Sequence, residues 1–243
     1  MSIHSSLKSN HLASRISMGI YGRITYEFAC QRGRAFRESH LHSTLSEILS
    51  SQFDPRSHVT FTDDYVEAIQ RRGHKNERGS KRKVDIVTRK WDERLLNNER
   101  LDSQISVCVE AKWSGSTHAS GESILMDLAR RSVVKRNNSE IQCFFVLAGP
   151  KDPMDQLIGS NTLDVNDPAR GGGGPLALPS SPSPIGPTYF LRDSGDNKRS
   201  PGPALMKKIE KKLPQYPDQI QTKLHTPRTE HDSRWRVYVW EVL

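Results

Sequence analysis

Two apolar runs near the middle of the sequence read Val84-Asp85-Ile86-Val87 and Ile105-Ser106-Val107-Cys108-Val109. Both are rich in β-branched residues and have the length of a strand, which favours strand over helix. Each run is nevertheless associated with an acidic residue. Asp85 lies inside the first run, and the second continues into Glu110-Ala111-Lys112-Trp113. Burying such charges is costly unless they pair with one another or bind a metal ion. The two runs therefore predict a sheet with a polar site at its end.

The spacing of the charged residues indicates what this site can hold. Side chains alternate between the faces of a strand, so Glu110 and Lys112 point the same way. If the first run pairs beside the second, Asp85 reaches the same place. Two carboxylates suit a hard divalent cation such as Mg²⁺, which takes one or two of them together with phosphates and water. An adjacent lysine can orient or help deprotonate an attacking water.

At Asp85, Glu110 and Lys112 the sequence resembles the PD-(D/E)xK nuclease superfamily of restriction-endonuclease-like folds. Val84 stands where many members have a proline, and the gap between the two acids is on the long side. The resemblance implies a metal-dependent endonuclease acting on double-stranded DNA, with a restriction or defence role. It implies that Asp85, Glu110 and the carbonyl of Ala111 hold Mg²⁺ or Mn²⁺, and that Lys112 acts on the water. Many members are dimers, so a homodimer is an open alternative, although no apolar pattern typical of a dimer interface is recognisable in the sequence.

A helix predicted over residues 34–53 supplies a further candidate. Glu38 falls on its apolar stripe at 100° per residue, whereas Glu47 falls opposite. In the superfamily the first helix often places a glutamate near the metal, so the resemblance makes Glu38 a fourth catalytic candidate. The alternative is an ordinary first-turn acid that favours the helix dipole. The stripe consists of Leu41, Leu45, Ile48 and Leu49.

A basic segment leads directly into Asp85. Gly73 and Gly79 favour a loop there. A basic loop beside a metal site is where a phosphate backbone would lie, although a solvated charge run is the alternative. The predicted nucleic-acid-binding residues of this loop are Arg71, Arg72, Lys75, Arg78, Lys81 and Arg82.

The order of predicted elements favours an α/β fold with a mixed central sheet flanked by helices. A strand over 58–62 precedes the two apolar runs, a helix over 122–137 follows them, and a continuous apolar strand covers 140–149. Arg130 and Arg131 lie in the C-terminal half of that helix, where cations suit the dipole. The resulting order, αβββαβ, is that of a restriction-endonuclease-like core.

Composition divides the chain into four parts. Residues 1–20, rich in Ser, Asn and His, predict a flexible arm, and residues 21–150 the nuclease-like core. Residues 151–203 are rich in Gly, Pro and Ser and predict a flexible insertion, with a short helix at its start. Residues 204–243 predict a basic helix and an alternating terminal strand that completes the core.

Charge and cysteine content indicate the kind of partner and the compartment of the protein. The 243 residues carry a net charge of +8, with a pI of about 9.5, which favours a polyanionic partner such as nucleic acid. The three cysteines are scattered, and Cys108 and Cys143 fall inside apolar strands, which indicates core thiols in a reducing compartment. Without a membrane-length apolar run or a secretory signal pattern, a cytoplasmic protein with no membrane partner is expected.

Three functions remain open from the sequence. The first is the metal-dependent endonuclease. The second is a non-catalytic nucleic-acid-binding protein with a nuclease-like fold, and the third is an interaction protein whose acids form only surface ion pairs. The intact set of Asp85, Glu110 and Lys112 favours the enzyme, because a protein that only binds has no need of all three.

Overall fold

A computed structural model of the chain gives the fold and its side chains. The structure describes residues 3–33, 36–70, 83–97, 99, 101–160, 162–163, 174–177, 183–186, 188–191, 203–213, 215–225 and 234–243.

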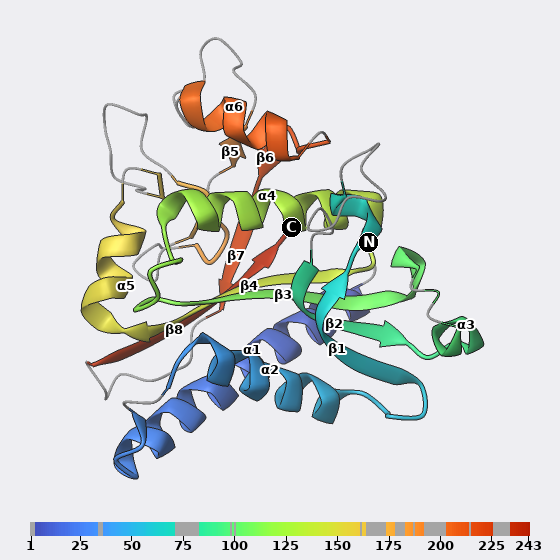
Figure 1. Cartoon of the computed structure of the whole chain (residues 1–243), viewed down its shortest axis with the longest axis horizontal. Helices are drawn as coiled ribbons and strands as arrows, with labels where there is room; N and C mark the ends of the chain where they lie inside the picture. The colour runs from blue at the N-terminus through green and yellow to red at the C-terminus, as the bar shows by residue number, and fades with distance from the viewer. Residues whose placement is uncertain are drawn as a thin grey trace.

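A six-stranded mixed sheet forms the centre of the molecule, in the order β1-β2-β3-β4-β8-β7 (Figure 1). β3 and β4 are parallel, and every other neighbouring pair in this sheet is antiparallel. A parallel pair needs a crossover, and a helix provides it here. The chain is therefore α/β, as predicted. The strands are β1 (His58–Tyr65), β2 (Lys83–Lys90), β3 (Ile105–Trp113), β4 (Gln142–Pro150), β7 (Thr222–His225) and β8 (Trp235–Val242).

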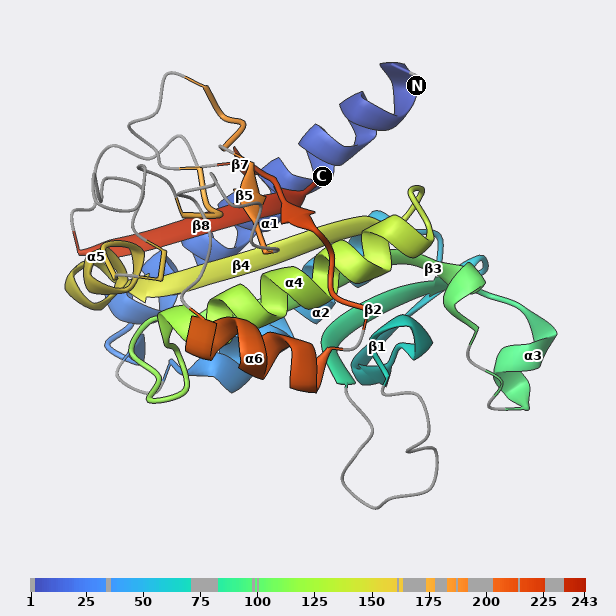
Figure 2. The same ribbon diagram turned by 90° about the horizontal axis from the view of Figure 1, so that it is seen from above.

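Helices cover both faces of this sheet (Figures 1 and 2). α1 (Ile3–Ala29) and α2 (Glu38–Gln52) lie on one face, and α4 (Gly121–Asn137) and α6 (Pro203–Lys212) on the other. Along β3, Val107, Val109 and Ala111 pack with the first pair, while Cys108 packs on the side of α4. Shorter elements are η2 (Glu67–Ile69), α3 (Glu93–Leu96), η3 (Asp102–Gln104), α5 (Lys151–Ile158), β5 (Tyr189–Phe190) and β6 (Gln219–Ile220).

The N-terminal region differs from its prediction. Residues 3–20 belong to α1, so the expectation of a flexible arm over residues 1–20 is wrong for the part that the structure describes. Leu12, Ile16, Ile20 and Ile24 recur every four residues and are buried against α2 and β8. This stripe provides the apolar surface that orders the helix, because packing stabilises helices more than propensity does.

The segment predicted as a flexible insertion begins with the short helix expected there, because α5 follows β4 directly. It differs from the prediction in that five further described side chains join the core on the α4 face. The glycines at 171–173 and the prolines at 179 and 182 lie outside the described residues. Beyond them, β8 pairs with the whole length of β4, from Cys143 opposite Val242 to Pro150 opposite Trp235. The five core side chains are Leu163, Leu176, Ala177, Tyr189 and Leu191.

Candidate active site

The site forms where two strands of the sheet separate. β2 and β3 pair as far as Ile86 and Val109, and the pairing ends before Asp85 and Glu110. Asp85 takes over the role of a missing ladder partner, because its Oδ2 accepts a hydrogen bond from the backbone N–H of Ala111 at 2.8 Å. This bond fixes the Asp85 carboxylate beside the end of β3.

Lys112 lies among three carboxylates. Its Nζ is 3.5 Å from Glu110 Oε1, on the same strand, and 3.9 Å from Glu38 Oε1, in the first turn of α2. The third carboxylate is Asp127 of α4, whose Oδ2 is 3.6 Å away. The side chain of Lys112 is only 13% exposed. One strand and both helix layers therefore converge on this ammonium group.

The crossover helix α4 supplies residues that the sequence analysis did not identify. Asp127, 3% exposed, also binds Arg130 Nη1 through its Oδ1 at 2.8 Å. Arg131 is fully buried, with Nη2 3.8 Å from Glu110 Oε2 and Nη1 donating to Cys108 Sγ at 2.9 Å. The favourable interaction with the helix dipole predicted for Arg130 and Arg131 therefore does not account for these contacts.

The sequence of α4 contains a pattern that indicates buried charged residues. Asp127 and Arg131 share one helical stripe with the buried Ile124 and Leu128, at spacings of three and four residues. Charged residues on an apolar stripe need partners, because an unpaired buried charge is strongly unfavourable. Polar residues on the buried side of the crossover helix were therefore the cue.

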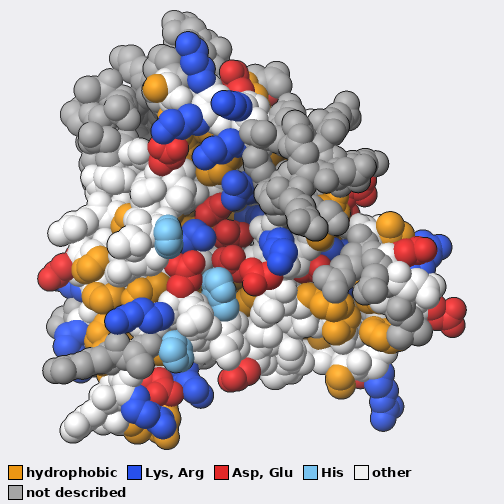
Figure 3. Space-filling model, in the orientation of Figure 1, with side chains coloured by type: hydrophobic (Ala, Val, Ile, Leu, Met, Phe, Trp, Pro, Cys, Tyr) orange, Lys and Arg blue, Asp and Glu red, His pale blue; other side chains and the backbone are white. Residues whose placement is uncertain are grey.

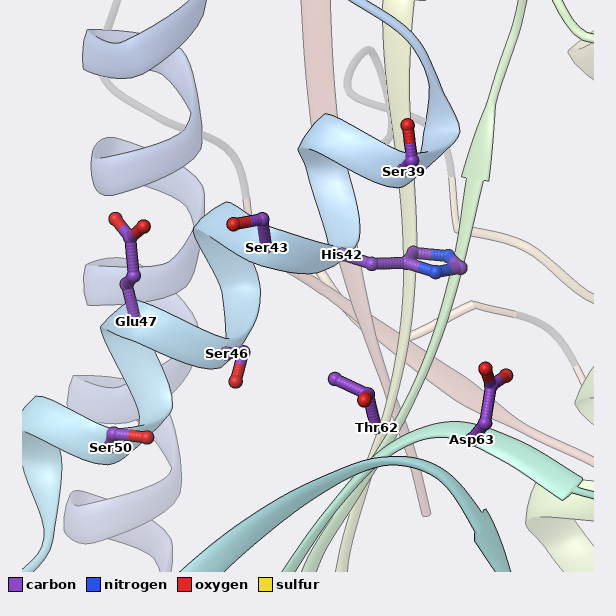
Figure 4. Close-up of a pocket in the computed structure, with 8 residues that line it drawn as sticks. All are labelled: Ser39, His42, Ser43, Ser46, Glu47, Ser50, Thr62 and Asp63. Atoms are coloured by element: carbon purple, nitrogen blue, oxygen red, sulfur yellow. The ribbon is translucent and has the colours of Figure 1, made fainter.

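His42 joins this cluster to a neighbouring pocket of about 540 Å³. Its Nε2 is 3.4 Å from Asp85 Oδ2. Figure 4 shows its ring projecting from α2 over the sheet, while Thr62 and Asp63 rise from β1. The pocket gives the cluster a polar, hydroxyl-lined approach from solvent. It is lined by Ser39, His42, Ser43, Ser46, Glu47, Ser50, Thr62 and Asp63.

Burial and neighbouring charges divide the carboxylates into two kinds. Burial, with the charges of Asp127 and Asp85, raises the pKa of Glu110 well above its ordinary value. Burial also raises the pKa of Asp127, although Lys112 opposes it. Burial acts to raise the pKa of Asp85, but the interaction with the His42 imidazole outweighs burial, so this pKa is lowered. The cluster thus contains one firmly ionised acid beside two that resist ionisation.

Lys112 and His42 respond to these acids in the opposite sense. Burial acts to lower the pKa of Lys112, but Asp127 and Glu110 outweigh burial and hold that pKa above its ordinary value. Burial likewise acts to lower the pKa of His42, and Asp85 outweighs it, so this pKa is raised. Both groups therefore favour their charged forms.

The carboxylate oxygens of this cluster are the kind of ligand that a hard divalent cation prefers. Glu38 Oε2 and Glu110 Oε2 are buried without a hydrogen-bond partner. Two such carboxylates, with water and phosphate oxygens, are what Mg²⁺ takes in proteins. In the described part of the chain, no three His, Cys, Asp or Glu side chains converge as a metal-binding group. The ammonium of Lys112 lies between the acids instead.

The structure brings together four of the predicted catalytic residues, Glu38, Asp85, Glu110 and Lys112, and places the backbone of Ala111 beside them. Figure 3 shows acidic side chains gathered at the middle of this face, with histidine beside them. The predicted phosphate-binding residues, Arg71, Arg72, Lys75, Arg78, Lys81 and Arg82, lie outside the described residues.

Within the described ranges, no helix combines the length and the apolar character needed to cross a membrane.

One fold serves many chemistries, so the function has to be inferred from the geometry of the site. No family model, curated protein or solved structure matches this chain.

Proposed function

We propose that this chain is a metal-dependent endonuclease that hydrolyses phosphodiester bonds in duplex DNA, with Asp85, Glu110 and Lys112 as catalytic residues. One observation supports this reading above the others: Glu38 and Glu110, whose carboxylates both flank Lys112, each have a buried Oε2 without a hydrogen-bond partner among the described residues. Buried carboxylate oxygens without a donor leave lone pairs that a hard divalent cation can use.

Asp85 and Glu110 would hold Mg²⁺ or Mn²⁺, together with the carbonyl of Ala111. Glu38 would join through a second ion or a bound water. When bound, the metal stabilises charge on the phosphate and lowers the pKa of the attacking water.

The surrounding residues would then share the remaining work. Lys112 would orient the water and offset charge on the phosphate. Asp127 would keep Lys112 on the face that it shares with Glu110, because it contacts the ammonium at 3.6 Å. Arg131 would hold the Glu110 carboxylate from the opposite side, at 3.8 Å. Neighbours of this kind commonly set the orientation of metal ligands and catalytic groups.

Two wider features agree with this proposal. The elements α2, β1, β2, β3, α4 and β4 follow one another in the order expected of a restriction-endonuclease-like core. The net charge of +8 favours a polyanionic substrate. Neither feature alone identifies a nuclease, but both fit the chemistry of the cluster.

Cleavage of supercoiled plasmid with Mg²⁺, with Mn²⁺ and with a chelator tests the proposal directly. We expect metal-dependent nicking by the wild type, and its loss in Asp85→Asn, Glu110→Gln and Lys112→Ala. The matched control is Glu140→Gln, an exposed acid in the turn after α4. Full activity in Asp85→Asn and Glu110→Gln, or none in the wild type with either metal, would refute it.

A second candidate is a non-catalytic nucleic-acid-binding protein with the same fold. Its support is the ammonium of Lys112, which already neutralises acids that would otherwise require a metal. Titration with Mn²⁺ separates the two functions. The enzyme should bind the ion through Asp85 and Glu110, whereas the binding protein should take up none at this cluster.

A further inference from the structure

We propose that α6 is a docking surface for the phosphate backbone of duplex DNA, beside the acid cluster. This inference rests on the proposed function and adds the element that holds the substrate. The phosphate-binding residues predicted from the sequence all lie in the segment that precedes β2. α6 lies more than one hundred residues further along the chain.

α6 presents its charge on one side and its apolar residues on the other. At 100° per residue its four lysines fall within one arc, which they share with Ala204, and Leu205, Met206 and Ile209 fall outside that arc. Ile209 is fully buried and packs into the core, as does Leu213 just after the helix. The helix is therefore held by its inner side, and its lysines face solvent. They are Lys207, Lys208, Lys211 and Lys212, all exposed.

α6 lies along α4, which carries Asp127 and Arg131 of the site. At one end Lys208 Nζ pairs with Glu122 Oε2, in the first turn of α4, at 2.9 Å. At the other end Arg136, in the last turn of α4, donates to the carbonyl of Gln215. Figure 2 shows the two helices side by side. The lysines of α6 are thus fixed relative to the site.

The same face of the molecule presents both charges. Figure 3 shows Lys and Arg side chains over α6, directly above the acidic side chains at the middle of the face. A duplex whose backbone lies on the lysines would therefore extend towards the acid cluster. Division into cations that hold the backbone and acids that hold a metal is what a metal-dependent nuclease needs.

The separation of the α6 lysines is comparable with the spacing of several phosphates on duplex DNA. Lys207 and Lys212 are five residues apart, which is about 7.5 Å along a helix axis. Duplex DNA carries one negative charge per ~1.7 Å of its axis, so about four phosphate charges fall within that length.

The salt dependence of DNA binding tests this surface. The variant is Lys207→Gln with Lys212→Gln, which leaves the Lys208–Glu122 pair intact and preserves helix propensity. Anisotropy of a labelled duplex is measured in chelator, so that nothing is cleaved. We expect the log–log slope against salt to fall by about 0.9 for each lost phosphate contact, or about 1.8 for two.

A charge-matched control separates docking from loss of net charge. Lys90→Gln with Lys151→Gln removes the same charge from the end of β2 and the start of α5. We expect this control to keep the wild-type slope. Amine-reactive labelling read by mass spectrometry should also show Lys207 and Lys212 protected by DNA, and Lys90 and Lys151 unprotected.

The outcomes distinguish the docking surface from the nuclease. A wild type that binds DNA with the same slope as the α6 variant, or a control that loses as much slope, overturns the docking surface alone. Lost binding in the α6 variant, with no cleavage by the wild type under any metal, supports the docking surface and overturns the nuclease. A wild type that does not bind the duplex overturns the docking surface.

Discussion

At the scale of single residues, the catalytic role proposed for Glu110 opposes its contribution to stability. Its carboxylate is buried beside Asp127 and Asp85, and its pKa is raised. We therefore expect Glu110→Gln to abolish cleavage and at the same time to raise the Tm of the metal-free protein at neutral pH. A rise of about 2–4 °C is expected if the relief is about 1 kcal/mol, given the size of the chain.

The pH dependence of this gain follows from linkage. A carboxyl whose pKa is raised on folding stabilises the fold below its ordinary pKa, and this contribution is lost as pH rises through the raised value. The Tm difference between Glu110→Gln and wild type should therefore be small near pH 4.5, the ordinary value, and grow towards neutral pH. Calorimetric scans across this range in chelator provide the measurement. A difference that shrinks with rising pH would contradict the assignment.

Asp127 should act on the rate and spare the metal. It contacts Lys112 and Arg130 and is not among the proposed ligands. We expect Asp127→Asn to lower kcat by about 10- to 100-fold, as is usual for the loss of a neighbour that orients a reacting group. Mn²⁺ affinity, followed by electron paramagnetic resonance, should stay within about threefold of wild type.

Glu140→Gln, an exposed acid in the turn after α4, is the control for Asp127→Asn. A variant in which kcat and Mn²⁺ affinity fall together would make Asp127 a ligand, or a residue needed by the fold. Restoration of kcat by Asp127→Glu would support the positioning role, because the carboxylate returns.

The sequence predicted β3 and its polar end but not the helix residues that complete the site. Alternation alone put Glu110 and Lys112 on one face, because a strand has a period of two. Which residues of α4 approach that face depends on how the crossover helix packs on the sheet. That packing is a tertiary property, so the stripe that Asp127 and Arg131 share indicates their burial but not that they reach Lys112 and Glu110. Glu38 was predicted from its place on the apolar stripe together with the resemblance.

At the scale of secondary-structure elements, a second buried charge connects neighbouring strands of the sheet. Arg89 is fully buried in β2. It donates to Asp64 Oδ2 at 2.7 Å, to the carbonyl of Leu101 at 2.6 Å and to that of Tyr65 at 2.7 Å. One guanidinium thus joins β1, β2 and the segment that enters β3.

Removing one partner of this pair should destabilise the fold. Asp64→Ala leaves a guanidinium buried without its carboxylate, which typically costs about 3–5 kcal/mol. Urea unfolding measures the effect, and Asp63→Asn is the neighbouring control. Asp63 is exposed and has a φ of 52°, a conformation that asparagine adopts readily. Equal stability of Asp64→Ala and the control would mean that the pair contributes little.

At the scale of the whole molecule, α1 decides whether the face of the sheet opposite α4 is covered. Its buried residues pack against α2, β4 and β8, which are distant in sequence. Ser, Asn and His between these residues hid the four-residue repeat, because average polarity outweighed periodicity. The fold class could therefore be predicted from the strands, but the extent of the core could not.

The packing of α1 gives a direct prediction. Ile20→Ala removes a fully buried side chain and should cost about 2–5 kcal/mol of stability. Met18→Ala removes a side chain that is 47% exposed on the same helix and should change stability by about 0.5 kcal/mol or less. Equilibrium unfolding in urea compares the two. Similar values for both would mean that α1 does not pack on the sheet in solution.

Lys112 also has a consequence for the protein when no metal is bound. Its ammonium lies 3.5–3.9 Å from Glu38, Glu110 and Asp127, so the chain supplies part of the counter-charge for these acids itself. A zinc finger unfolds when its ion is removed, because metal binding and folding are one event there. In the proposed nuclease, loss of Mg²⁺ would stop cleavage but leave the fold intact, and activity would return without refolding.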